Sequence, residues 1–297
     1  MDNEKIFKSK KELLNYLGIK NNFLYSGFSS KYSNFEIPKK NGGFRPIKSP
    51  HFNLKKVQRI ILDNILYKYK QLDCVYGLSK NKGVFHNALI HSKNVSSQLL
   101  ILDIENFFPT ISYKSVIDVF QKLGFNKENS SILTKICTID KSLPQGAPTS
   151  PYLASMVCFN LDKELYIYCK RRKFIYTRYF DDISISGINI LPLCIKQIEK
   201  IISKYGFKCN ENKKQLFDFG ANKIINNVQI TNFGISVTDD YKKEIKDCYK
   251  TLMNDNNEQN RKIFSGKFGF YLYINKKEAN LFLQKLKINF LKNPNTQ

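Results

Sequence analysis

The stretch YTRYFDDISISG, residues 176–187, decides how this chain is organised. Apolar and polar residues alternate on both sides of Asp181-Asp182, which is the period-2 pattern of β-strands. The acidic pair marks the turn, so the stretch predicts a β-hairpin with two carboxylates at its tip. An Asp-Asp pair in a hairpin is by itself ordinary turn chemistry. A function for it therefore depends on what the rest of the chain brings near it.

A third carboxylate, Asp103, interrupts the apolar run LLILDI at residues 99–104, which predicts a buried strand. A carboxylate at the end of a buried strand is costly unless a cation or hydrogen bonds compensate it. If Asp103 converges with Asp181 and Asp182, the three form a site of hard oxygen ligands that suits Mg²⁺. Two such ions, about 3.5–4 Å apart, activate a hydroxyl nucleophile and steady a leaving pyrophosphate.

The overall charge indicates a polyanionic partner. The chain of 297 residues has 48 Lys and Arg against 25 Asp and Glu, a net charge of +23. Nucleic acid is the first interpretation, an anionic membrane the second, and a solvated lysine-rich surface the plain alternative. With 42% hydrophobic and 13% aromatic residues the chain can build a core, which excludes general disorder. The length predicts about two domains.

Several classes of protein are disfavoured. There is no run of 18 or more apolar residues, and the start MDNEKIFKSKK has no apolar stretch of a signal peptide. We therefore expect a cytoplasmic protein with no membrane partner. The seven cysteines include no CxxC pair, and the three histidines supply no second zinc half-site. A disulfide scaffold or zinc module is not expected.

Patterns elsewhere predict a mixed α+β centre with helical ends. Helices are predicted over residues 5–18 and 192–205, and through Leu54, Val57, Ile61 and Ile65. Ser150-Pro151 predicts a helix start with a serine cap. The glycine turn at 39–43 follows an extended segment, and the last 60 or so residues read as helical.

Four ordered motifs resemble those of reverse transcriptases. YFDD matches their YxDD box, LDIENFFPTI their first palm aspartate motif, LPQGAPTSPYLA (143–154) the segment between, and IPKKNGGFRPIKSP (37–50) their fingers motif. The resemblance covers about residues 30–236. It implies a right-hand polymerase with fingers (1–98), a ferredoxin-like or RRM-like antiparallel palm (99–236) and a short helical thumb (237–297).

A further signature resembles retron reverse transcriptases. Asn87-Ala88-Leu89-Ile90-His91 matches their NAxxH motif, and Ile230-Thr231-Asn232 is a degraded counterpart of their VTG motif. Asn232 can adopt the left-handed backbone that glycine would. The resemblance implies RNA recognition by Asn87, His91, Thr231 and Asn232. A histidine satisfied locally on a helix face is the alternative for His91.

The resemblance also implies roles for single residues. Asp103 and Asp181 become the principal metal ligands and catalytic residues, with Asp182 in support. Phe108 excludes the ribose 2′-hydroxyl, although plain core packing is the alternative. The remaining implied contacts are Lys40 and Arg45 to the triphosphate, Gln145 and Gly146 to nucleotide and template, Lys213 (or Lys214, one residue out of register) to pyrophosphate, and Tyr179 to the primer. Tyr271 and Tyr273 in the thumb either stack on RNA or belong to its core.

The implied function is RNA-directed DNA synthesis. A retron enzyme uses dNTPs and two Mg²⁺ ions, with Mn²⁺ as a substitute, to copy a structured non-coding RNA into branched single-stranded DNA (msDNA). The implied partners are this template and primer RNA, its DNA product, a separate effector or toxin protein in anti-phage defence, and a host RNase H, because no RNase H-like domain is recognisable. Another bacterial defence or diversity-generating polymerase, or a catalytically idle RNA-binding scaffold, are the alternatives.

Overall fold

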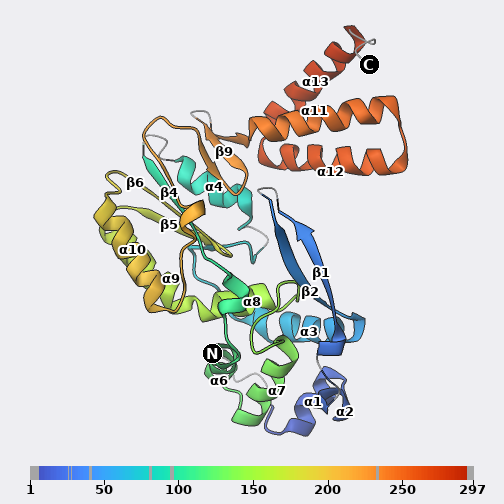
Figure 1. Cartoon of the computed structure of the whole chain (residues 1–297), viewed down its shortest axis with the longest axis vertical. Coiled ribbons are helices and arrows are strands. Elements are labelled where there is room, and N and C mark those ends of the chain that lie inside the picture. The colour runs from blue at the N-terminus through green and yellow to red at the C-terminus, as the bar shows by residue number, and fades with distance from the viewer. Residues whose placement is uncertain are drawn as a thin grey trace.

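The centre of the molecule is a five-stranded sheet in which the strand order is β3-β5-β6-β4-β7 (Figure 1). A computed structural model describes the chain over residues 7–25, 27, 29–39, 42–79, 82–93, 97–231 and 234–292. All neighbours in the sheet are antiparallel except β3 and β5, which run parallel. The predicted α+β class is confirmed. The strands are β3 (Val75–Tyr76), β4 (Gln98–Asp103), β5 (Ile175–Tyr179), β6 (Asp182–Gly187) and β7 (Gln215–Phe217).

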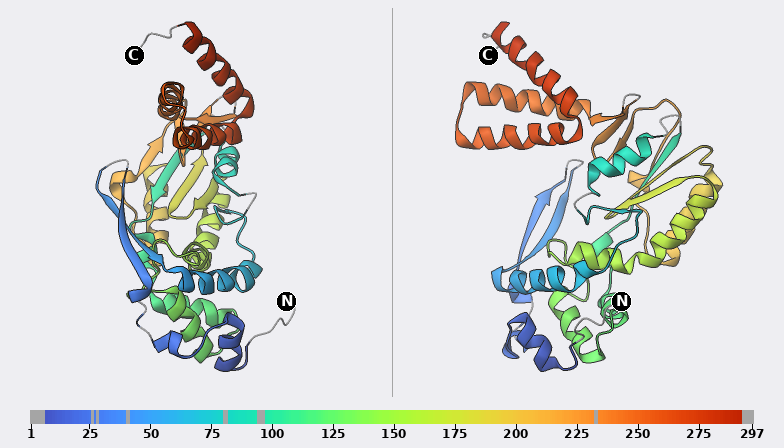
Figure 2. Two further views of the ribbon diagram at one scale, coloured as in Figure 1. Left: turned by 90° about the vertical axis from the view of Figure 1, so that its right-hand side faces the viewer. Right: turned by 180° about the vertical axis from the view of Figure 1, so that it is seen from behind.

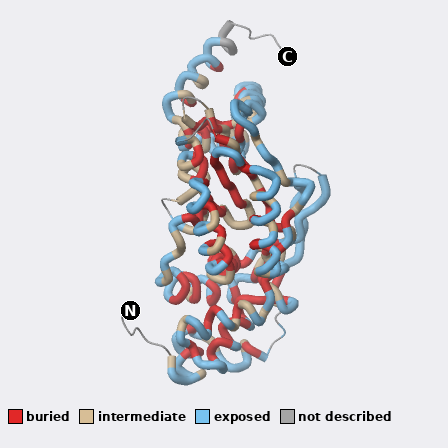
Figure 3. The backbone as a smooth tube through the Cα atoms, turned by 90° about the vertical axis from the view of Figure 1, so that its left-hand side faces the viewer, coloured by how far each residue is buried: buried red, intermediate tan, exposed pale blue. Residues whose placement is uncertain are grey.

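Strand β4 is apolar on both faces because the sheet is covered on both sides. Leu100 and Leu102 belong to the main core, whereas Leu99 and Ile101 belong to or pack against a second, smaller core. Successive side chains of a strand point to opposite faces, so the alternation explains the continuous run LLILDI. In Figure 3 the tube is buried along these central strands.

Helices cover the two faces. On one face, α9 (Phe159–Arg171) packs on β5 and α10 (Pro192–Lys204) packs on α9. On the other, α4 (Val84–Ser92) contacts β5 and a three-stranded antiparallel sheet of order β10-β9-β8 (Figure 1). That sheet consists of β8 (Lys223–Ile225), β9 (Val228–Thr231) and β10 (Gly234–Val237).

The N-terminal half forms a helical layer and a projecting hairpin. The hairpin pairs β1 (Tyr32–Pro38) with β2 (Phe44–Pro50), and it extends toward the end of the molecule that carries the C-terminal helices (Figures 1 and 2). The helices and turns up to residue 68 are α1 (Lys10–Leu17), α2 (Asn22–Tyr25), η1 (Ser29–Lys31), α3 (Phe52–Asn64) and η2 (Leu66–Lys68).

The packing crosses the domain boundary expected at residue 98. Strand β3 and helix α4 precede that boundary, yet they contact the central sheet. Helix α7 follows it, yet packs on α1 and α3. The remaining elements between β4 and the C-terminal helices are α5 (Phe107–Thr110), α6 (Tyr113–Lys122), α7 (Lys127–Cys137), α8 (Ser150–Val157) and η3 (Glu211–Lys213).

The C-terminal segment is helical, as expected. Its helices are α11 (Asp239–Asn254), α12 (Glu258–Ile274) and α13 (Lys276–Lys292). They share the second core with α4 and the three-stranded sheet. Tyr271 is fully buried there, so stacking on RNA is ruled out for it, whereas Tyr273 is 49% exposed.

Two local expectations needed correction. Ser150 does not cap its helix: Thr149 occupies the N-cap position without a side-chain cap bond, and Ser150 is the first helical residue. This helix, α8, ends at Val157, and Cys158 separates it from α9. In addition, the first helix begins at Lys10, where Ser9 accepts a hydrogen bond from the Glu12 amide and acts as the N-cap.

Within the described ranges, no helix is long and apolar enough to cross a lipid bilayer. All seven cysteines are free thiols, and five of them are buried.

Candidate active site

The three aspartates meet where β4 ends and the β5–β6 hairpin turns. Asp103 and Asp182 are direct partners in the β4–β6 register. Asp181 lies in the turn, where its carbonyl oxygen accepts a hydrogen bond of 2.9 Å from the Ile104 amide. Phe180 has a left-handed backbone, φ 56°, which makes the turn tight. The hairpin with an acidic tip is therefore confirmed, and the sheet register brings the third carboxylate to it.

Asp103 is buried, Asp181 and Asp182 are partly buried, and the three carboxylates repel one another. Burial raises the pKa of Asp182 to about 7, and the charges of Asp181 and Asp103 add to the shift. Burial also raises the pKa of Asp181, with a further contribution from Asp103, while Lys213 and Arg45 oppose it. Crowded oxygen ligands of one charge are the donor set that a hard divalent cation prefers. The residues fit a divalent metal ion, which would supply the missing positive charge.

Two neighbouring side chains already hold part of this donor set. Lys213 Nζ lies 2.7 Å from Asp103 Oδ2, and Asn226 Nδ2 donates a 2.7 Å hydrogen bond to Asp182 Oδ2. Across the residues that the structure describes, no three His, Cys, Asp or Glu side chains are already gathered as a metal site. The lysine and the amide stabilise the negative charge of Asp103 and Asp182 respectively.

The structure distinguishes between the two adjacent lysines. Lys213 reaches Asp103, whereas Lys214 is engaged by Glu199 at 2.8 Å and Glu211 at 2.5 Å. Both belong to or follow the short turn η3, whose start is tied to the strand by a 2.8 Å bond from the Asn210 amide to the Asp103 carbonyl. Of the two lysines, Lys213 is therefore the one that lies at the carboxylate cluster.

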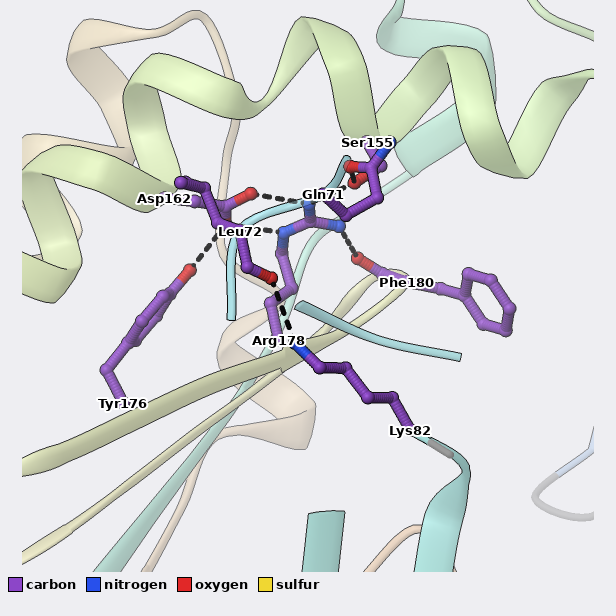
Figure 4. Close-up of polar contacts among 8 residues, drawn as sticks. All are labelled: Gln71, Leu72, Lys82, Ser155, Asp162, Tyr176, Arg178 and Phe180. Atoms are coloured by element: carbon purple, nitrogen blue, oxygen red, sulfur yellow. Dashed lines mark hydrogen bonds and ion pairs between the residues drawn. The ribbon is translucent and has the colours of Figure 1, made fainter. Parts of the chain in front are cut away.

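A buried ion pair supports the turn of the β5–β6 hairpin (Figure 4). Arg178 and Asp162 are both 1% exposed, and Arg178 Nε and Nη2 bind the two carboxylate oxygens of Asp162 at 2.7 and 2.6 Å. Arg178 Nη1 donates to the Phe180 carbonyl at 2.7 Å, and the Tyr176 hydroxyl donates to Asp162 at 2.7 Å. The guanidinium thus holds the backbone of the residue that precedes Asp181.

This network was not predicted from the sequence, although a signal for it exists. Arg178 breaks the apolar alternation of β5, and a charged residue on a strand face that is otherwise buried signals a buried partner. Its partner Asp162 lies on α9, among the buried residues of that helix. The network continues through Ser155, which receives a 3.2 Å bond from Arg178 Nη2 and donates to Gln71 at 2.7 Å.

The fingers hairpin approaches the site through β2. Arg45 is exposed on β2, and its charge opposes the rise in the pKa of Asp181. The Lys48 amide donates 2.9 Å to the Gln145 carbonyl, and a Cβ at Gly146 would lie 2.9 Å from the Lys48 carbonyl. Gly146, with φ 129°, is therefore required for close packing on β2. Lys40 lies outside the described residues.

The aromatic residues predicted to touch nucleotide and primer are half-buried. Phe107 is buried, and the ring of Phe108 packs on it with a centroid distance of 5.3 Å. Tyr179 makes an edge-to-face contact with Phe180 at 4.8 Å. Phe108, on α5, follows Asp103 closely in the sequence, and Tyr179 pairs with Asp182 in the β5–β6 register. Their contacts with substrates stay predictions.

The NAxxH residues do not reach a surface that RNA can touch. Asn87 is fully buried and His91 is 2% exposed. His91 bonds Ser186 Oγ at 2.7 Å and Thr177 Oγ1 at 2.8 Å, and burial lowers its pKa to about 3, so the ring is neutral. Direct RNA contact by these two is therefore wrong. Thr231 ends β9 and its hydroxyl donates 3.3 Å to the Gly234 carbonyl, while Asn232 lies outside the described residues.

The site combines a mainly antiparallel sheet with three carboxylates at adjacent strand ends. A cationic hairpin lies on one side of it, and a helical segment lies beyond. This arrangement defines a right-hand nucleic acid polymerase. The family model of the reverse transcriptases (RNA-dependent DNA polymerases) matches residues 37–291. The chain belongs to this family, as a reverse transcriptase of the retron type.

Curated relatives agree with this assignment. The retron Ec86 reverse transcriptase of Escherichia coli is 30% identical over 84% of this chain and 79% of its own. The retron Mx162 reverse transcriptase of Myxococcus xanthus is 25% identical over 69% of this chain and 48% of its own.

Solved structures share the fold. A telomerase of Candida albicans, in complex with a fragment of telomeric RNA, superposes with a TM-score of 0.52 at 11% identity, over 90% of this chain and 60% of the telomerase. An apo telomerase of Candida tropicalis gives 0.50 at 12% identity, over 73% and 48%. At these identities the likeness concerns the fold alone.

The buried ion pair should dominate local stability. Asp162→Asn leaves the Arg178 guanidinium buried without its counter-charge, and we expect a loss of about 3–5 kcal/mol in the free energy of unfolding. The control is Lys204→Gln, which removes an exposed pair with Glu164 (2.7 Å) and should lower the free energy of unfolding far less. Urea titrations measure both. Equal losses would show that the buried pair has no special weight.

The free energy of unfolding of the metal-free protein should fall as the pH rises, because the Asp182 carboxyl loses its proton. The native state keeps the Asp182 proton up to a pKa of about 7, whereas the ordinary value is 3.8. Between these values the folded state binds more protons than the unfolded chain, so the free energy of unfolding falls as pH rises. Asp182→Asn removes this loss. Its advantage over the wild type, measured by urea titration in EDTA, should grow through this window and level off above it; a constant difference would contradict the shift.

Proposed function

We propose that this retron-type enzyme copies a structured non-coding RNA into branched single-stranded DNA, msDNA. The partly buried cluster of Asp103, Asp181 and Asp182 carries the proposal, because three mutually repelling carboxylates serve no need of a passive RNA scaffold. The named relatives are retron reverse transcriptases. An RNA-directed DNA polymerase of this type would use its own RNA as template and primer.

The metal proposal is two Mg²⁺ ions, with Mn²⁺ as a substitute. Asp103 and Asp181 would be the main ligands and Asp182 a further one. The metal supplies Lewis-acid chemistry at the primer hydroxyl and the triphosphate. Lys213, which pairs with Asp103, carries the positive charge that we propose assists the departing pyrophosphate.

The nucleotide proposal places the dNTP between the fingers hairpin and the carboxylates. Arg45 on β2 and Lys40, which lies between β1 and β2 in the sequence, would bind the triphosphate, since cations form strong charge-assisted hydrogen bonds with phosphate oxygens. Gln145 would contact nucleotide or template beside Gly146. Phe108 would exclude the ribose 2′-hydroxyl, and Tyr179 would support the primer terminus.

The net charge of +23 supports RNA and DNA as the macromolecular partners. The exposed Tyr273 on α12 offers one ring for stacking in the thumb. We further propose that the DNA serves anti-phage defence in the bacterial cytoplasm, with a separate effector or toxin protein and with a host RNase H that trims the template. These partners are the ones that the resemblance to retron reverse transcriptases implies.

The decisive experiment concerns the nucleic acid that copurifies with the protein expressed from its native flanking DNA. RNase A and then debranching enzyme are applied, and the products are compared on denaturing gels with those of Asp181→Asn. We expect a small DNA that shifts on debranching and is absent from the variant, because one metal-ligand charge is lost. Asp118→Asn, an exposed aspartate on α6, makes the same charge change elsewhere and should leave the yield unchanged.

Each other outcome points elsewhere. Unbranched DNA would indicate another defence or diversity-generating polymerase. RNA without DNA in wild type and variant, together with no extension of an artificial primer, would favour the idle RNA-binding scaffold. Normal DNA from Asp181→Asn would overturn the metal-site assignment.

Sugar selection should depend on Phe108. Phe108→Ala removes the ring, and we expect the preference for dNTP over rNTP, measured as the ratio of kcat/KM, to fall at least about tenfold. Phe108→Tyr keeps the ring and should keep the preference. An unchanged ratio in Phe108→Ala would leave Phe108 a packing residue of the core.

A further inference from the structure

Two amide side chains link the NAxxH helix to the acidic cluster. Asn87 Nδ2, on α4, donates a 2.8 Å hydrogen bond to Asn226 Oδ1, and Asn226 Nδ2 donates a 2.7 Å bond to Asp182 Oδ2. We call this series of two hydrogen bonds the amide chain. The three side chains come from a helix, from the turn between β8 and β9, and from the first residue of β6. No stretch of sequence connects them, since 139 positions separate Asn87 from Asn226.

The direction of these bonds follows from the charge of the carboxylate. An Asp182 that binds a metal ion is ionised and only accepts hydrogen bonds, so Asn226 must turn its NH₂ group toward it and its carbonyl oxygen away. Asn87 must then present its own NH₂ group to that oxygen. A hydrogen bond to a charged acceptor is stronger than a neutral one, and the amide chain is therefore oriented with respect to Asp182.

The backbone of the β8–β9 turn positions Asn226 beside Asp182. Asn226 and Asn227 are the two central residues of the β8–β9 hairpin, with φ of 49° and 65°. Asparagine is one of the few side-chain-bearing residues that tolerate this left-handed pair, which a tight hairpin requires. The flanking pair Ile225 and Val228 is buried, so the turn is anchored in the second core.

Helix α4 is anchored on the hairpin that bears the aspartates. His91 bonds Thr177 on β5 and Ser186 on β6, the two strands that flank Asp181. One face of α4 therefore binds the strands, and Asn87, one helical turn earlier, reaches Asn226. Movement of either part would change the placement of Asp182.

Local stability does not explain an asparagine at position 87. Within the described structure, Asn87 Oδ1 is buried and has no hydrogen-bond partner. A buried polar atom without a partner is unfavourable, and an apolar side chain at this fully buried position would avoid it. The contribution of the Asn87 amide to the structure is therefore the hydrogen bond that its nitrogen donates to Asn226.

We infer that Asn226 and Asn87 are positioning residues for DNA synthesis, which orient the Asp182 carboxylate toward its divalent metal ion. The inference rests on the metal-dependent polymerase function proposed above. It gives the NAxxH helix a role in the interior of the protein, in which Asn87 orients Asn226, Asn226 orients Asp182, and His91 holds the helix on the strands.

The test compares two neighbouring variants in the full-length protein. Asn226→Gly removes the amide but keeps the left-handed backbone, and Asn227→Gly makes the same change at an exposed residue of the same turn. Primer extension on an artificial RNA template avoids any need for the native RNA. We expect Asn226→Gly to raise the Mg²⁺ concentration for half-maximal rate about tenfold, with Asn227→Gly unchanged, because a bond to a charged group is lost.

A double-mutant cycle distinguishes positioning from packing. Asn87→Ala should raise the Mg²⁺ requirement of the wild type but add nothing in the Asn226→Gly background, because Asn87 acts through Asn226. Additive effects, or equal behaviour of Asn226→Gly and Asn227→Gly, would overturn the inference. Thermal melting of each variant shows whether a loss is merely unfolding.

A direct binding measurement separates this inference from the proposed function. Mn²⁺ binding to the metal-free protein, followed by electron paramagnetic resonance, should weaken in Asn226→Gly and not in Asn227→Gly. If the wild type extends no primer, the polymerase function fails while Mn²⁺ binding still tests the amide chain. If the wild type is active and binds Mn²⁺ as Asn226→Gly does, only the amide chain is wrong.

Discussion

Electrostatic repulsion among the partly buried carboxylates of Asp103, Asp181 and Asp182 is the constraint around which the site is arranged. Burial and mutual charge raise the pKa values of the last two, so the cluster is unfavourable without compensation. Compensation comes from Lys213 and Asn226, which bind one oxygen each of Asp103 and Asp182. We propose that a divalent cation supplies the remaining compensation.

The groups that compensate the cluster come from elements far apart in the chain. The short turn η3 brings the lysine, the β8–β9 hairpin brings the amide, and the β5 strand brings Arg178, whose guanidinium holds the backbone of Phe180. Arg178 is itself neutralised by Asp162 on α9. Each face of the central sheet therefore contributes to the geometry of one hairpin turn, and the two cores that cover the sheet are also the supports of the site.

The retron relatives show the family of this chain, whereas the likeness to telomerases shows only its fold. The family match and the relatives assign the chain to retron-type reverse transcriptases, whereas the telomerase superpositions speak only of the shared architecture. Within this chain the motif residues Asn87 and His91 lie in the interior. The NAxxH motif resembles an RNA-recognition element, but here both residues direct their hydrogen bonds to protein groups. Its role in this chain is therefore inside the protein.

Local pattern alone was enough to determine the acidic hairpin, the apolar strand that ends in Asp103, the helical C-terminal segment and the basic character of the chain. These depend on alternation, turn chemistry and charge, which are properties of neighbouring residues. Tertiary structure decided the rest: the register that pairs Asp103 with Asp182, the choice of Lys213 over Lys214, the burial of Tyr271, and the amide chain through Asn226. The physical reason is that these depend on which side chains meet across strands and helices that are distant in sequence, and only packing of the sheet and its two cores brings them within hydrogen-bonding distance.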